Sequence, residues 1–166
     1  MVSIPMAVFF EGLASFFPSY YYSLPEPYAS VLSIALLAPI IEEFGKAYPL
    51  FYRHGETKKS VINLGFLVGL GFGITEFLEY VLIVGVSPIF RLPGIFFHAA
   101  NTSIVAYGIA NKKSATFYLV AVALHFSYNI AALFDPFQFL ILIIFLLTLP
   151  LFGYLYKKTP ETLIAY

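Results

Sequence analysis

The chain has 166 residues, of which 60% are hydrophobic and only 11% are charged, and its formal net charge is zero. This balance excludes an ordinary water-soluble domain, in which about 25% of residues are charged, and zero net charge gives no indication of a nucleic-acid partner. The absence of cysteine excludes disulfides, thiolate metal ligands and cysteine nucleophiles.

Long apolar stretches follow one another along the chain, separated by breaks that contain charge, proline or glycine. Because a helix needs about 20 predominantly apolar residues to cross a bilayer, we predict an all-α fold, a polytopic bundle of about six transmembrane helices in one integral membrane domain, 1–166. The first stretch has no basic n-region and no clear cleavage site, so it is taken as a retained helix rather than a signal peptide. The predicted spans are 4–23, 28–52, 61–85, 92–110, 115–134 and 137–156.

The basic residues of the loops indicate how the bundle is oriented. One face of the predicted bundle carries seven of them, whereas the other face carries Arg91 alone. By the positive-inside rule the seven-residue face, and with it both termini, is predicted to be cytoplasmic. The seven residues are Arg53, Lys58, Lys59, Lys112, Lys113, Lys157 and Lys158.

The second predicted span carries three ionisable side chains, Glu42, Glu43 and Lys46. A charged side chain that faced lipid would cost about 2.5–3.5 kcal/mol or more, so these should face the interior of the bundle. Glu42 and Lys46 stand four residues apart on one helical face and are predicted to pair. A second, adjacent carboxylate is more than a structural ion pair requires, which points to acid–base chemistry.

The third predicted span combines a row of glycines with two acidic residues. Gly65, Gly69 and Gly73 are spaced four apart, a pattern that permits close contact with another helix. Glu76 and Glu79 follow on the next turns. Glu76 is the deeper of the two and the preferred functional residue, whereas Glu79 can reach the membrane interface.

The fourth and fifth predicted spans each contain a histidine with polar neighbours: His98 precedes Asn101 and Thr102, and His125 precedes Asn129 by four residues. With the predicted boundaries, the acids and both imidazoles lie at about the same depth in the bilayer. Such a layer is what a water-filled catalytic or metal-binding chamber requires. The last span is a plain apolar run and is interpreted as scaffold.

Four motifs follow one another along the predicted spans: Glu42-Glu43-x-x-Lys46, Gly71-Phe72-x-x-x-Glu76-x-x-x-Tyr80, Arg91 with His98, and His125-x-x-x-Asn129. Taken in order, they resemble those of the PrsW family of intramembrane glutamic proteases, which is distantly similar to the CAAX-processing prenyl endopeptidases. The resemblance covers about 42–129, and Phe77 stands where the family commonly has Asn. It implies hydrolysis of peptide bonds in membrane-associated protein substrates, such as anti-sigma factors, at the membrane of a prokaryotic cell.

Hydrolysis needs a base that takes a proton from water and donors for the tetrahedral oxyanion. We expect one of Glu42 and Glu43 to activate water, assisted by His98 or Glu76, with no cofactor. The spacing favours Glu42 as the partner of Lys46 and Glu43 as the base, and the reverse assignment stays open. The expected oxyanion donors are His125 and Asn129, and the expected supporting residues are Lys46, Glu79, Tyr80 and Arg91.

Three alternatives remain at this stage. A metalloprotease is possible in chemical terms because O and N ligands are present for Zn²⁺, although no H-E-x-x-H spacing exists. A proton- or ion-coupled transporter or channel also uses carboxylates and imidazoles within the membrane, and Pro39 and Pro93 would fit its broken helices. The third alternative is a catalytically silent interaction protein of the same fold. The expected metal ligands are Glu42, Glu43, Glu76, His98 and His125.

Overall fold

The computed structural model describes residues 24–52, 57–134 and 139–164. The first predicted span, 4–23, lies outside these residues, as does Arg53. Within them the chain is helical, and its β structure is one isolated bridge between Thr57 and Leu163. The predicted all-α membrane bundle is therefore confirmed.

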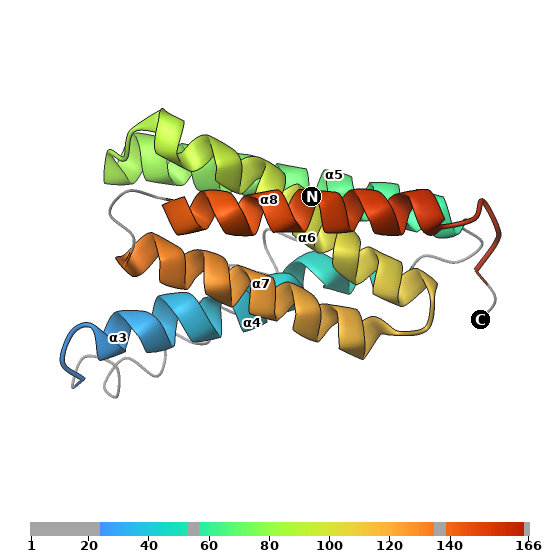
Figure 1. Ribbon diagram of the computed structural model, residues 1–166, viewed down its shortest axis with the longest axis horizontal. Coiled ribbons are helices and arrows are strands. Elements are labelled where there is room, and N and C mark those ends of the chain that lie inside the picture. The colour runs from blue at the N-terminus through green and yellow to red at the C-terminus, as the bar shows by residue number, and fades with distance from the viewer. Residues whose placement is uncertain (1–23, 53–56, 135–138, 165–166) are drawn as a thin grey trace.

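The described residues form five helical stretches that pack against one another and run along the long axis of the molecule (Figure 1). The first consists of α3 (Tyr28–Ser30), the π-helix η1 (Val31–Leu37), α4 (Ala38–Ala47) and the 3-10 helix η2 (Tyr48–Tyr52). The second is α5 (Lys58–Glu79), which continues into the π-helix η3 (Tyr80–Val84). The others are α6 (Pro88–Ala110), α7 (Ser114–Phe134) and α8 (Phe139–Lys158).

Four of these stretches are long and apolar enough to cross a membrane: Tyr28–Tyr52, Lys58–Val84, Ser114–Phe134 and Phe139–Lys158. They make the chain an integral membrane protein. α6 is equally long but less apolar, because it carries polar residues such as Arg91, His98 and Asn101. Most of its C-terminal two-thirds is buried in the bundle. A helix that contacts protein rather than lipid can carry polar side chains at much lower cost.

The glycine row of α5 packs closely against another helix, as predicted, and that helix is α6. A Cβ at Gly65 would meet Ala106, one at Gly69 would overlap the backbone of His98, and one at Gly73 would overlap the backbone of Ile95. The two backbones therefore approach closely along three turns. This approach places the last turns of α5, which carry Glu76, directly beside His98.

α7 is held against the other face of α6 by a hydrogen bond and by stacked rings. The Asn101 amide donates to the Ala121 carbonyl over 3.0 Å. The rings of Phe97 and Tyr128 stack with centroids 4.3 Å apart. These contacts bring His125 of α7 to within ring contact of His98 of α6, with centroids 5.0 Å apart.

Two helix starts differ from the prediction by three or four residues. α5 begins at Lys58 rather than 61, because the Thr57 hydroxyl accepts a hydrogen bond from the Ser60 N–H and caps the helix. α6 begins at Pro88 rather than 92. Pro88 occupies the first helical position, where a missing N–H costs little, and Pro93 lies inside the helix without ending it.

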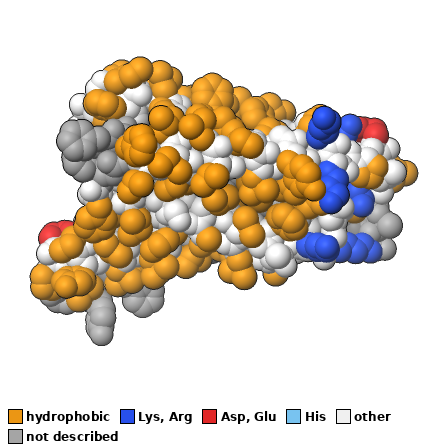
Figure 2. All heavy atoms as spheres, viewed as in Figure 1, with side chains coloured by type: hydrophobic (Ala, Val, Ile, Leu, Met, Phe, Trp, Pro, Cys, Tyr) orange, Lys and Arg blue, Asp and Glu red, His pale blue; other side chains and the backbone are white. Residues whose placement is uncertain are grey.

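One end of the bundle is rich in lysine (Figure 2). Lys58 begins α5, Lys112 and Lys113 connect α6 to α7, and Lys157 and Lys158 end α8. The tail after α8 folds back on this end, where the Lys58 N–H donates to the Thr162 carbonyl over 2.8 Å. The grouping agrees with the charge asymmetry used above, and the cytoplasmic location of this end stays a prediction.

Candidate active site

Four polar side chains form a closed layer in the middle of the bundle: Glu43 and Lys46 from α4, His98 from α6 and His125 from α7. Each is 0–2% exposed. The Lys46 ammonium lies 2.6 Å from Glu43 Oε1 and 3.0 Å from His98 Nδ1. Glu43 Oε1 also lies 2.9 Å from His125 Nδ1. We call these four residues the closed layer.

The partners of the two imidazoles determine which ring nitrogen carries a proton. An ammonium can only donate, so His98 Nδ1 accepts from Lys46, and its Nε2–H donates to Glu76 Oε2 over 2.7 Å. A carboxylate can only accept, so His125 donates from Nδ1 to Glu43. His125 Nε2 is then left with its lone pair, 3.8 Å from Glu42 Oε2.

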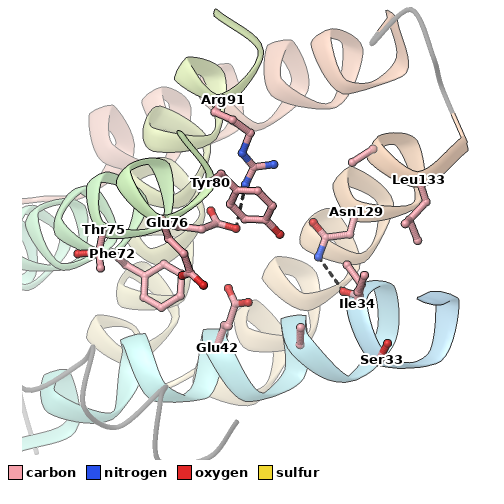
Figure 3. Close-up of a pocket in the computed structure, with 13 residues that line it drawn as sticks. Ser33, Ile34, Glu42, Phe72, Thr75, Glu76, Tyr80, Arg91, Asn129 and Leu133 are labelled. Atoms are coloured by element: carbon pink, nitrogen blue, oxygen red, sulfur yellow. Dashed lines mark hydrogen bonds and ion pairs between the residues drawn. The ribbon is translucent and has the colours of Figure 1, made fainter. Parts of the chain in front are cut away.

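A cavity of about 520 Å³ opens beside this layer. Figure 3 shows side chains from α4, α5 and α7 converging on it, with Arg91 of α6 at one side. We call the residues that line it the pocket wall. They are Ser33, Ile34, Ala38, Glu42, Phe72, Thr75, Glu76, Glu79, Tyr80, Arg91, Asn129, Ala132 and Leu133.

The two adjacent glutamates lie in different surroundings. Glu42 belongs to the pocket wall and is 8% exposed, whereas Glu43 is completely buried in the closed layer. Both contact Lys46, at 3.8 Å from Glu42 Oε2 and 2.6 Å from Glu43 Oε1. The expected pairing of Glu42 with Lys46 is present, but Glu43 is the closer partner. Residues three apart and residues four apart both share a helical face. The spacing alone therefore could not show which of the two glutamates lies closer to Lys46.

Glu76 connects the pocket wall to the closed layer. Its Oε1 forms an ion pair with Arg91 Nη2 at 3.0 Å, and its Oε2 accepts a hydrogen bond from His98 Nε2. The Arg91 guanidinium also lies over the Tyr80 ring, 3.7 Å from its centroid. Glu79 lies on the pocket wall and is exposed. Thus six of the ten predicted site residues line the pocket, and the other four form the closed layer.

Asn129 lies on the pocket wall, where its amide donates to the Ile34 carbonyl over 2.9 Å (Figure 3). This carbonyl is available because of Pro39. The Ala38 N–H bonds to the Ser33 carbonyl in the wide π turn, and Pro39 has no N–H with which to reach Ile34. Within a membrane-spanning segment, a backbone carbonyl without a helical partner needs another donor, and Asn129 supplies it.

Sequence reasoning assigned no role to Phe72 or to the π turns. Phe72 lies under the Lys46 ammonium, 4.4 Å from the ring centroid, and its ring also packs against His98. The π-helices η1 and η3 shape the pocket wall, to which they contribute Ser33, Ile34 and Tyr80. Pro39 is the sequence signal for η1. We find no comparable signal for η3.

Among the described residues, Glu42, His98 and His125 form a group that could contribute metal ligands, with one donor atom of each within 4.8 Å of the others. The donor types suit Zn²⁺. The arrangement does not, because both ring nitrogens of His98 already have partners, Lys46 and Glu76. Of the other expected ligands, Glu43 contacts Lys46 and His125, and Glu76 contacts Arg91 and His98.

A family model described as "PrsW family intramembrane metalloprotease" matches residues 1–155, nearly the whole chain. No curated protein and no solved structure matches the chain.

Proposed function

The chain belongs to the PrsW family of membrane proteases, and on that premise we propose that it hydrolyses peptide bonds of membrane-associated proteins with water activated by Glu42. Family membership favours hydrolysis over the transporter and the silent interaction protein. The observation that carries the choice of Glu42 is its place on the pocket wall, since Glu43 is completely buried.

The proposed reaction begins with water held in the cavity beside Glu42. The Glu42 carboxylate takes a proton from this water as the water oxygen attacks the carbonyl carbon of the peptide bond. The resulting tetrahedral intermediate collapses when the C–N bond breaks, and Glu42 returns the proton to the leaving amine. Glu42 thus ends the cycle ionised, and one water molecule has been consumed.

The negative oxygen of the intermediate needs donors. Asn129 uses one of its two amide N–H groups for Ile34 and has a second that can donate. Tyr80 lies on the same wall and offers a hydroxyl (Figure 3). We propose these two as oxyanion donors. We assign His125 a positioning role in place of the expected role as an oxyanion donor. Its Nε2 faces Glu42, and its proton lies on Nδ1, which donates to Glu43.

The metalloprotease alternative is favoured by the family description and by the group of Glu42, His98 and His125. A metal bound there would polarise the substrate carbonyl and acidify a bound water. It would first have to displace a partner of His98.

The test is cleavage of a panel of single-span membrane peptides by the detergent-purified chain. We expect Glu42→Gln to lower the cleavage rate about 10²–10⁴-fold, the range for loss of a general base. Glu161→Gln makes the same chemical change at the lysine-rich end, where Glu161 contacts Lys59, and should leave the rate unchanged. A chelator should also leave it unchanged. If Glu42→Gln cleaves the peptides at the wild-type rate, the proposal is refuted. If a chelator inhibits cleavage and Zn²⁺ restores it, the metal alternative is favoured.

A further inference from the structure

We propose that the Lys46 ammonium is the resident cation of this site and excludes a divalent metal ion from the group formed by Glu42, His98 and His125. The inference deepens the proposed function, on which it rests for the role of the site. In this role Lys46 is a positioning residue, and its positive charge supplies part of the electrostatic effect that a metal ion would have there.

The position of Lys46 carries the first step. Its Nζ lies 3.0 Å from His98 Nδ1 and 3.8 Å from Glu42 Oε2, so it contacts two of the three candidate ligands directly. Through Glu43 Oε1 it is also linked to the third, His125. The ammonium therefore already lies among the atoms that would hold an ion.

The surroundings keep this ammonium in place. Lys46 is completely buried, and a buried charge persists only when it is paired and hydrogen-bonded. It has two carboxylates, an imidazole nitrogen and the face of the Phe72 ring around it. Each of these groups offers negative charge, a lone pair or an electron-rich face, which are the partners that a cation requires.

Competition with a metal follows from this arrangement. His98 must free a ring nitrogen to bind an ion, and that means losing either Lys46 or Glu76. If Lys46 moved only slightly, it would leave two cations side by side in a medium of low dielectric constant, where like charges repel strongly. Removal of the ammonium leaves the two imidazoles and the carboxylate, a donor set that suits Zn²⁺.

The experiment measures Zn²⁺ binding by equilibrium dialysis and elemental analysis of the detergent-purified full chain, without substrate. We expect Lys46→Met to bind about one Zn²⁺ per chain, at least tenfold more tightly than wild type. Lys46→Arg keeps the cation and should bind no better than wild type. Lys46→Met combined with His125→Ala removes a ligand and should lose the gained site.

Lys46→Met leaves Glu43 buried without its cation and could fail to fold, so Glu43→Gln/Lys46→Met serves as a second variant that keeps all three ligands. Gain of a His125-dependent Zn²⁺ site in either folded variant supports the inference. No gain in any folded variant, or a gain that does not depend on His125, overturns it. Because no substrate is involved, failure of the cleavage assay does not affect this result.

Discussion

The closed layer and the pocket wall meet at two adjacent residues, Glu43 and Glu42, whose chemistry is identical. In the closed layer Glu43 contacts Lys46 and His125 and has no exposure. On the pocket wall Glu42 borders a cavity of about 520 Å³. From this difference in burial we propose separate roles for the two carboxylates: Glu43 positions other side chains, and Glu42, which lines the cavity, activates water.

The largest expected effect is on the closed layer. Glu43→Gln leaves the Lys46 ammonium without its nearest carboxylate, and loss of one partner of a buried ion pair costs about 3–5 kcal/mol of unfolding free energy. Unfolding in mixed detergent micelles measures this loss. Glu43→Gln/Lys46→Met removes both charges and should recover most of the stability. A fully stable Glu43→Gln single variant would contradict the account of this layer.

The next effect concerns how the closed layer is assembled. Gly69→Ala places a Cβ against the backbone of His98, and the resulting overpacking should cost about 1–3 kcal/mol. Gly71→Ala is the matched control two residues away, because a Cβ there meets no atom within 4 Å. The same unfolding measurement should show Gly71→Ala to be at least as stable as wild type. Equal destabilisation by both would contradict the close α5–α6 contact.

The smallest effect is on the link between the two regions. Arg91 holds Glu76, and Glu76 in turn holds His98. Arg91→Gln should lower kcat/KM of peptide cleavage about tenfold, a loss of ~1.4 kcal/mol of transition-state stabilisation, with little change in thermal stability. Arg91→Lys keeps the charge and should recover part of the rate. An unchanged rate in Arg91→Gln would show that Glu76 needs no such support.

Much of this arrangement could be predicted from the sequence. Apolar stretches of membrane-spanning length predicted the starts of the described helices to within four residues. The spacing of Gly65, Gly69 and Gly73 indicated close contact with another helix, which the structure identifies as α6. The cost of charge in lipid indicated that the intramembrane acids and imidazoles face inward. These are properties of single helices, which a sequence specifies directly.

What could not be predicted depends on how helices are rotated against one another. Whether Glu42 or Glu43 faces the cavity depends on the rotation of α4 about its axis, which residue spacing alone does not define. The bond from Asn129 to Ile34 depends on a π turn whose register pairs Ala38 with Ser33. Pro39 permits that turn, but a proline alone does not identify the donor on another helix.

The most direct test of the division between the two glutamates compares two variants that each lack one of these carboxylates. Peptide cleavage is measured, in the presence of chelator, for Glu42→Gln and for Glu43→Gln/Lys46→Met after both have been shown to be folded. We predict that the double variant cleaves at least tenfold faster than Glu42→Gln, because it retains the carboxylate on the pocket wall. The reverse order, with Glu42→Gln the faster enzyme, would contradict it and make Glu43 the base.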